Sequence, residues 1–544
     1  MYLINFLFFK LLKFDLFNKL LSKYISIKYH NNEKKFKIEY YKKYFGILNE
    51  NLSNNNKLCL FNNLFSANSI ETISLYIFLI NIFKFNGFKP AIFSSFKIYN
   101  LINKLDILSL PPLLSYNSLF LKDEINFETI NQIKKYKWKN VSCGIFALSS
   151  TFKDLKTEEF NLKNQRHKKI LKKNLIKSID YANSFYRFYK KNKIGSAIFS
   201  DPGYVGQGEM FEILTNKNIP CYQFFMSIDE NKIIFKKYLK NNQKEHFDKI
   251  SDDNWKNLLN KKQNKKHLRV SLQKIKKLYL KNNWHSSVGA TRSENFYSKK
   301  KIFKLLNLDI EKPTAVIFNH IFWDGTFFYG SETFPTYRDW FLATIKVANK
   351  NQNLNWIIKP HPANKVQNSR YGIYETLTEE EKIIQKVFGK IPSNLKILNN
   401  KNKINSWSLY QFLDYCLTIR GTPGIESALF GAQTIVCGTG RYENRGFVKY
   451  FDNKKKYLNY LLKLKKPPKK NKKVIQKAIL YAENVFFKKT LKLASISVTF
   501  KKNKSAEMDL KIKFKSKNEF CNNTDVLKIT EWLKSNKQEF YLDN

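Results

Sequence analysis

The sequence is poor in glycine and arginine, and its cysteines show no pairing pattern. Glycine accounts for 18 of 544 residues, half the usual fraction of about 7%, and only nine of the 96 basic residues are arginine. None of the six cysteines belongs to a CxxC pair, which argues against a disulfide framework or a zinc site and fits reduced thiols in a cytosol. No run of about 18 apolar residues occurs, so we expect no transmembrane helix.

Lysine dominates the composition instead. Lysine and arginine together number 96 against 44 acidic residues, a formal charge of +52, and the 43% of hydrophobic residues are enough to bury a core. Such a charge attracts nucleic acids or anionic lipid headgroups. Because lysine is spread along the whole chain, without a helix-turn-helix or zinc-finger motif, we interpret the charge mainly as codon bias and expect no specific nucleic-acid partner.

The N-terminal segment 1–14 is apolar with interspersed lysines. It lacks the charged start and the small-residue cleavage site of a signal peptide. Two interpretations stay open: the segment lies on an anionic membrane surface, or it packs as an ordinary first helix. The expected location is the cytoplasm, either free or peripheral on the inner face of the cell membrane.

Short runs of β-branched and aromatic residues alternate with longer helical patterns, which is typical of α/β units with parallel sheets. We predict two Rossmann-like domains with parallel sheets that face a central cleft, with ligands at the carboxyl ends of the strands. The predicted divisions are an N-terminal domain, a helical connector without a clear strand, a second domain and a C-terminal helical segment, at residues 1–231, 232–300, 301–470 and 471–544.

The first chemical motif is a histidine between two prolines, directly after an apolar predicted strand: Lys359-Pro-His-Pro362. Each proline fixes its own backbone and favours extended geometry in the residue before it, so His361 is held rigidly at a strand end. An imidazole there can donate to a phosphate or act as an acid. The alternative is a turn histidine that makes a local backbone hydrogen bond.

A second motif leads from a predicted strand into a helix, over residues 417–431. Thr422 fits the N-cap and Pro423 the first helical position, so the helix N-terminus would offer N–H groups to an anion. Gly424 would let a ligand approach the backbone, and Glu426 could accept hydrogen bonds from ribose hydroxyls. The alternative is a well-capped helix of a Rossmann fold.

Three of the nine arginines lie around this motif. Arg420 precedes it, while Arg441 and Arg445 belong to a glycine-rich loop after the next predicted strand. In a chain dominated by lysine, arginine indicates bidentate contacts to phosphate or carboxylate that lysine cannot make. The sequence therefore predicts two neighbouring, arginine-bearing loops at one edge of the second sheet.

Three segments resemble motifs of the capsule polysaccharide biosynthesis/export family, which includes Kdo transferases that use a CMP-activated sugar: Lys359–Pro362, Thr422–Gly431 and Gly440–Phe447. The resemblance covers residues 315–450. It implies a GT-B fold, nucleotide-phosphate contacts from His361 and the Thr422 turn, and a ribose contact from Glu426. Arg420 stands in a position where the family commonly has a Thr/Ser pair.

The loop 319–325 follows the first predicted strand of the second domain and would face the same cleft. Asp324 could be a base or a sugar-binding carboxylate, and His320 a polar contact. The alternative is a capped turn around a packed Trp323.

The loop 200–209 follows a predicted strand of the first domain and resembles the acceptor-side turn of such enzymes. Asp201 is the candidate base for an acceptor hydroxyl, and Tyr204 and Gln207 are candidate acceptor-binding groups. The alternative is a plain glycine-rich turn between a strand and a helix.

Together with these residues, the resemblance implies a GT-B-like glycosyltransferase of surface polysaccharide synthesis, of capsule or lipopolysaccharide type. It would move a sugar from a nucleotide donor, CMP-Kdo-like as first choice, to a lipid-linked or saccharide acceptor. The candidate catalytic residues are Asp201, Asp324 and His361. The candidate donor-binding residues are Lys359, His361, Arg420, Thr422, Gly424, Glu426, Arg441 and Arg445.

No DxD motif follows a predicted strand, so we expect a metal-independent reaction and no cofactor beyond the nucleotide-sugar substrate. Two other classes of protein stay open. One is a non-catalytic basic protein that binds nucleic acid or a membrane surface, and the other is a polyol-phosphate transferase or sugar epimerase of GT-B shape.

Overall fold

The computed structural model describes most of the chain after residue 56. The described residues are 57–62, 70–93, 108–110, 126–156, 159–227, 231–261, 264–280, 295–323, 327–361, 364, 377–398, 404–500 and 508–540. The N-terminal segment 1–14 and Asp324 lie outside them, so the predictions made for both stay predictions.

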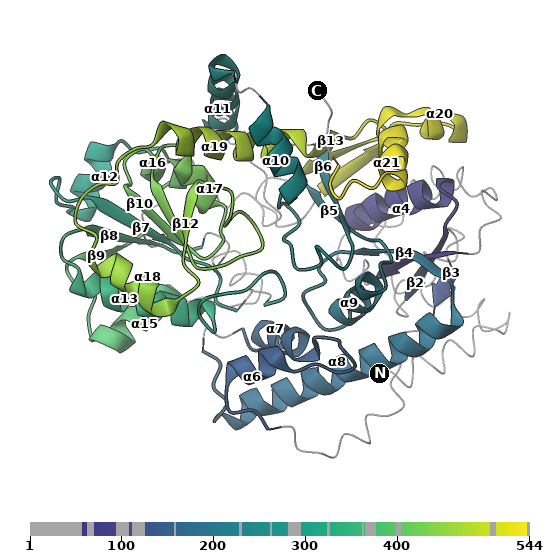
Figure 1. Cartoon of the computed structure of the whole chain (residues 1–544), viewed down its shortest axis with the longest axis horizontal. Coiled ribbons are helices and arrows are strands. Elements are labelled where there is room, and N and C mark those ends of the chain that lie inside the picture. The colour runs from purple at the N-terminus through teal and green to yellow at the C-terminus, as the bar shows by residue number, and fades with distance from the viewer. Residues whose placement is uncertain are drawn as a thin grey trace, which may run out of the picture.

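The first sheet has seven strands in the order β13-β6-β5-β4-β1-β2-β3 (Figure 1). Five strands are parallel: β1 (Leu58–Asn62), β2 (Lys89–Phe93), β3 (Leu108–Leu110), β4 (Ile194–Phe199) and β5 (Cys221–Met226). Two strands at one edge are antiparallel to their neighbours: β6 (Lys232–Tyr238) and β13 (Thr490–Lys492). The order 3-2-1-4-5 of the parallel strands is that of a Rossmann-like sheet.

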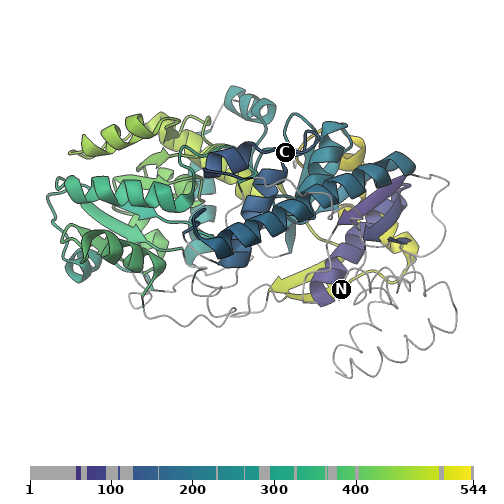
Figure 2. The same cartoon turned by 90° about the horizontal axis from the view of Figure 1, so that it is seen from below.

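Helices and a hairpin cover both faces of this sheet. One face packs against α4 (Ile70–Phe85), the hairpin β14 (Ile496–Phe500)–β15 (Met508–Ile512), α20 (Lys517–Asn522) and α21 (Thr524–Lys534). The other face packs against α6 (Ile130–Lys135), α7 (Cys143–Leu155), α8 (Gln165–Lys191) and α9 (Gly208–Asn216). The long helix α8 runs across the front of Figure 2.

The second sheet has six parallel strands in the order β12-β11-β10-β7-β8-β9. They are β7 (Thr314–Phe318), β8 (Asn355–Lys359), β9 (Leu395–Ile397), β10 (Tyr415–Thr418), β11 (Gln433–Val436) and β12 (Val448–Tyr450). The chain returns from β9 to pair β10 with β7, so the strand order reverses between these two strands. Ligands of doubly wound sheets bind at such a reversal.

This sheet is also covered on both faces. One face packs against α13 (Tyr337–Lys350), α15 (Glu379–Phe388) and α18 (Lys454–Leu462). The other packs against α10 (Asp252–Asn260), α11 (Lys265–Leu280), α12 (Lys299–Leu306), α16 (Ser406–Tyr410), α17 (Pro423–Ala428) and α19 (Lys472–Glu483). The predicted fold class, two Rossmann-like α/β units with parallel sheets, is confirmed.

Two segments cross between the units. After β7, the buried side chains of Trp323, Phe327 and Phe328 join the core of the first unit, where Phe328 contacts the rings of Phe146 and Phe211. At the other end of the chain, a π-helical turn at Asn484–Lys488 leads from α19 into β13, which joins the first sheet. The two units are therefore interlocked and not merely joined by a linker.

Two expectations from the sequence need correction. The segment 232–300 was expected to be helical, but its first residues form β6 and extend the first sheet beyond residue 231. The segment 471–544 was expected to be helical with one short β-like patch near Ser495–Phe500. That patch is β14, but β13 and β15 are two further strands that were not expected. No helix in the described segments is both long and apolar enough to cross a membrane.

Candidate active site

Two histidines follow neighbouring strands of the second sheet, His320 after β7 and His361 after β8. His320 Nε2 accepts a hydrogen bond from the N–H of Ile419 at 3.3 Å and lies 3.1 Å from Thr418 Oγ1. Because Nε2 is an acceptor, Nδ1 carries the proton of the neutral ring. His320 and His361 are close enough for their charges to interact, which brings the ends of β7, β8 and β10 to one place.

Both imidazoles are neutral at pH 7. Burial, together with the nearby His361 and arginine charges, lowers the pKa of His320 to about 3. Burial lowers the pKa of His361 to about 4. The neighbouring Lys359 donates from Nζ to the carbonyl of Ile404 at 3.0 Å, and burial lowers its pKa to about 8. This edge can therefore offer neutral N–H donors and one ammonium group to a ligand.

The turn into α17 differs in detail from its prediction. Pro423 occupies the first turn of the helix as predicted, but the Thr422 side chain makes no cap, and its Oγ1 accepts from Arg441 Nη2 at 3.3 Å instead. The N–H groups of Gly424 and Ile425 donate to carbonyls of the turn itself, at 3.0 and 2.9 Å. The backbone donors at this helix end are thus partly used within the protein.

Two other residues of the motif contact protein groups. A Cβ on Gly424 would lie 2.2 Å from Tyr442 Oη, so the glycine is needed for the packing of this tyrosine. Glu426 is 2% exposed and accepts a hydrogen bond from Tyr410 Oη at 2.6 Å. Their roles toward a nucleotide stay predictions.

The three arginines are all buried and all bonded to protein groups. Arg420 donates to the carbonyl of Tyr329 and pairs with Glu332. Arg445 Nη2 donates to the carbonyl of Ile250 at 2.7 Å and lies 2.7 Å from an oxygen of Asp252. Each guanidinium holds its own loop against another segment, and the donor-binding roles predicted for Arg420 and Arg445 stay predictions.

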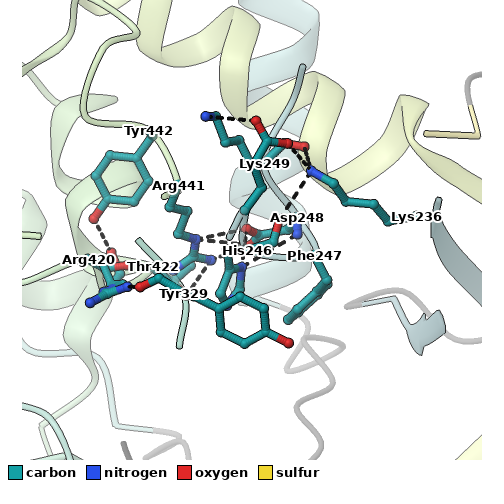
Figure 3. Close-up of polar contacts among 12 residues, drawn as sticks. Lys236, His246, Phe247, Asp248, Lys249, Tyr329, Arg420, Thr422, Arg441 and Tyr442 are labelled. Carbon is teal, nitrogen blue, oxygen red and sulfur yellow. Dashed lines mark hydrogen bonds and ion pairs between the residues drawn. The ribbon is translucent and has the colours of Figure 1, made fainter. Parts of the chain in front are cut away.

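Arg441 has the most complete set of partners. Its Nε lies 3.0 and 3.1 Å from the two carboxylate oxygens of Asp248, with Nη2 also bonded to Asp248. Its Nη1 donates to the carbonyl of Arg420 at 2.9 Å. Figure 3 shows this guanidinium between Asp248 and Thr422. The sequence argument for bidentate contacts holds for Arg441, with a carboxylate of the same chain as the partner.

Tyr329, in the segment between β7 and α13, connects this region to the first sheet. Tyr329 Oη donates to Gln223 Oε1 at 3.3 Å, and Gln223 Nε2 donates to the carbonyl of Ser200 at 3.2 Å. Burial raises the pKa of Tyr329, and the charge of Asp201 raises it further, so the carboxylate lies near this ring. Arg420, after β10 of the second sheet, donates to the backbone of Tyr329, whose side chain bonds to Gln223 of the first sheet. The carboxyl ends of both sheets therefore meet here, as in a GT-B arrangement.

The other residues predicted on this side are bonded within their own unit. Gln207 Oε1 accepts from the N–H groups of Ser200 and Asp201 at 3.2 and 3.1 Å, which closes the glycine-rich turn. The Lys153 ammonium lies 4.2 Å from the centre of the Tyr204 ring. The acceptor-binding roles of Tyr204 and Gln207 stay predictions.

The sequence argument missed a histidine–aspartate pair in the segment between β6 and α10. His246 Nδ1 lies 2.6 Å from Asp248 Oδ1, the same carboxylate that Arg441 binds. The spacing His-x-Asp was visible in the sequence, but the lysine- and asparagine-rich surroundings made the segment look like a plain connector. Among the described residues, no group of three or more His, Cys, Asp or Glu side chains could hold a metal ion.

No family model matches the chain, and no curated protein matches it. Among solved structures, it is similar to KpsC of Thermosulfurimonas dismutans, a beta Kdo 2,4 transferase (10% identity, 53% of this chain and 79% of that chain, TM-score 0.32). It is also similar to the UDP-GlcNAc 2-epimerase of Neisseria meningitidis (12%, 79% and 96%, TM-score 0.24) and to a glycosyltransferase of Rickettsia africae (11%, 80% and 94%, TM-score 0.24). At these values the similarities carry no argument about activity, which is therefore argued from the site.

Proposed function

We propose that the protein is a glycosyltransferase that binds a nucleotide-sugar at the carboxyl edge of its second sheet. The observation that carries this proposal is the meeting of His320, His361 and Thr418 where the strand order reverses. A Rossmann-like sheet binds nucleotides at this place. Neutral imidazole N–H groups and the nearby Lys359 suit a phosphate ester, because they offer donors and one positive charge to its oxygens.

The finer assignment rests on the sequence resemblance of residues 315–450. We infer a CMP-Kdo-like donor as first choice, a lipid-linked or saccharide acceptor, and a role in surface polysaccharide synthesis. His361, Lys359 and Thr422 would contact the phosphate and Glu426 the ribose. The three arginines hold their loops in place, and their predicted contacts to the donor phosphate remain part of this proposal, in which leaving-group charge is met without a metal.

The acceptor would enter from the first unit. Asp201, with Tyr204 and Gln207 in the same loop, is the acceptor-side candidate there, and Asp324 is a further candidate in the loop after β7. Attraction to an anionic membrane surface would bring a lipid-linked acceptor close to this basic protein.

A thermal-shift experiment with CMP, CDP, UDP and GDP tests the donor site. We expect at least one nucleotide to raise the melting temperature of the wild-type protein and to lose most of this effect in the His361→Ala variant. The matched control is His267→Ala, because His267 lies on α11 and is half exposed beside Glu483. Equal shifts in wild type and His361→Ala would contradict the proposed site.

Product analysis with CMP-, UDP- and GDP-sugars then separates the reaction classes. Transfer to a saccharide or lipid-linked acceptor supports the proposal, whereas epimerised sugar or transferred polyol phosphate indicates another enzyme of this shape. Tight RNA binding with a steep salt dependence, and no nucleotide binding, would instead indicate a nucleic-acid-binding protein.

A further inference from the structure

Residues 239–251 carry the chain from the first sheet to the second unit, and His246 and Asp248 lie in this segment. Asp248 is 5% exposed, and its carboxylate receives the Nε and Nη2 donors of Arg441. The Arg441 and His246 charges hold the pKa of Asp248 well below its usual range, against the effect of burial. Asp248 is therefore an ionised, acceptor-only group at any pH near neutral.

An ionised Asp248 fixes the tautomer of His246. Since the carboxylate can only accept, the 2.6 Å contact favours the proton on His246 Nδ1 over the 3.5 Å approach of the Asp248 N–H to the same nitrogen, and Nε2 then carries a lone pair. No described residue forms a hydrogen bond with Nε2, and 22% of the side chain is exposed. An oriented imidazole whose basic nitrogen is not used by any described residue is the arrangement that a general base needs.

The position of His246 connects the two strand-end regions. Its ring packs against Phe247 and Tyr329, with centroids 4.4 and 5.8 Å apart (Figure 3). Its backbone N–H donates to the carbonyl of Gly440 at 2.8 Å, in the loop after β11. On one side, Tyr329 lies near Asp201 in the loop after β4. On the other side, Arg441, which binds Asp248, also donates to Thr422.

The segment is held firmly enough for such a role. The ammonium group of Lys489, which is fully buried, donates to the carbonyls of Phe247 and Lys249 at 2.8 and 2.9 Å. Lys236 pairs with Glu245 at 2.7 Å and also reaches the carbonyl of His246. These contacts, from β6 and from the residue before β13, fix the backbone on both sides of the histidine.

We propose that His246, oriented by Asp248, is the general base that activates the acceptor, which deepens the proposed function and rests on it. The acceptor hydroxyl gives its proton to His246 Nε2 while its oxygen forms a bond to the anomeric carbon of the donor sugar. The bond between that carbon and the phosphate oxygen breaks, and its electron pair leaves with the nucleotide. The resulting imidazolium is stabilised by Asp248 and returns its proton to solvent after the product departs.

The charges around His246 favour its neutral form at pH 7. Burial and the guanidinium groups of Arg441 and Arg420 lower the pKa of His246, whereas Asp248 raises it, and the net direction is downward. The other polar groups that face the residue are the Tyr329 ring and the Lys236 ammonium on its carbonyl. The base is therefore ready to accept a proton without prior deprotonation.

The test compares His246→Gln with wild type in the full-length protein, using whichever CMP-, UDP- or GDP-sugar the wild type turns over. Glutamine can keep the hydrogen bond to Asp248 but cannot act as a base at neutral pH. We expect the transfer rate to fall by about 10²- to 10⁴-fold, with an unchanged thermal shift by the nucleotide. The acid limb of the wild-type pH–rate profile should disappear in the variant.

Asp248→Asn provides a second variant, because an asparagine amide can donate to Nδ1 and move the proton to Nε2. It should also lose most of its transfer rate while His246 is still present. His267→Gln is the matched control, since it removes another carboxylate-paired histidine and should keep full activity. Carbethoxylation of the wild type by diethyl pyrocarbonate, read by mass spectrometry, should modify His246 at pH 7.

The outcomes separate the two proposals. If the wild type turns over no nucleotide-sugar, the proposed function fails and the base fails with it. If the wild type is active and His246→Gln keeps its rate and its pH profile, only the base assignment is overturned. Lack of diethyl pyrocarbonate modification at His246 in the folded wild type would also overturn it, because Nε2 would then be closed.

Discussion

At the scale of single residues, the arginines show that residue type alone does not tell whether a guanidinium binds a ligand or another group of the protein. A planar guanidinium in a lysine-rich chain indicates a site that needs several directed N–H donors. Arg441 makes such contacts, but with Asp248, which lies 193 positions earlier in the chain. A bidentate contact has the same sequence signature whether its carboxylate or phosphate belongs to the protein or to a ligand.

Glu209 gives a residue-scale prediction about pH. This carboxyl group is fully buried in the first turn of α9, where it accepts from the N–H of Gly206 at 2.8 Å, and burial raises its pKa from 4.5 to about 7. The raised pKa means that its contribution to stability is present below pH 4.5 and is lost as the pH rises through 7. Wild type loses this contribution as the pH rises, whereas glutamine does not titrate. From pH 5 to pH 8, the unfolding free energy of Glu209→Gln minus that of wild type should therefore increase by roughly 2–3 kcal/mol.

Urea unfolding of both proteins at the two pH values measures this difference. Glutamine has nearly the same shape and can still accept from Gly206, so the turn should persist in the variant. A difference between the two proteins that stays constant from pH 5 to pH 8 would show that Glu209 does not titrate in this window.

At the scale of elements, the turn into α17 depends on Gly424 for packing. Tyr442 Oη donates to the carbonyl of Gly421 at 2.5 Å and lies where a Cβ on Gly424 would be. We expect Gly424→Ala to lower the unfolding free energy by about 1–3 kcal/mol because the tyrosine must move. In a Tyr442→Phe background, which removes the hydroxyl, the same substitution should be less destabilising.

A double-mutant cycle in urea measures the coupling between these two positions. If Gly424→Ala instead leaves stability unchanged and weakens only nucleotide binding, the close approach of a ligand is the reason for this glycine. The two explanations thus predict opposite results in one pair of measurements.

The elements themselves were largely predictable from the sequence. Apolar runs with polar flanks predict strands over 314–319, 355–359, 395–398, 415–419 and 433–437, and these are β7, β8, β9, β10 and β11. The helices predicted over 164–191 and 337–350 are α8 and α13, whereas the short edge strand β12 was not predicted. The strand β6 was missed because it contains Lys236 and Lys237, both buried. Their ammonium groups bond to carbonyls and to Glu245 from distant parts of the chain, and no local pattern shows such partners.

The candidate site was predictable only in part for the same reason. Residues that follow strands, such as His361 and Asp201, could be placed at sheet edges from the order of strands and helices. The pairing of His246 with Asp248 and Arg441 could not, because it depends on how a connecting segment crosses between the two units. Topology places strand ends, whereas long-range packing decides which side chains meet.

At the scale of the whole molecule, the interlocked units should unfold together. Phe328 belongs by sequence to the second unit, yet it is fully buried in the core of the first, 5.3 Å from the ring of Phe146. The Lys244 ammonium lies 3.7 Å from the centre of the Phe328 ring and adds a contact from the connecting segment. We therefore expect a single cooperative transition for wild type in differential scanning calorimetry.

Phe328→Ala should separate this transition into two, because it removes the ring that joins the cores, at a cost of about 3–5 kcal/mol. The matched control is Phe341→Ala, since Phe341 is equally buried but lies wholly within the second unit, against Phe322. The control should be destabilised by a similar amount through the same loss of buried surface while its transition stays single. Two transitions in both variants would contradict a specific role of Phe328, because any loss of stability would then separate the units. A single transition in Phe328→Ala would also contradict it and would mean that the connecting segment and β13 suffice to hold the units together.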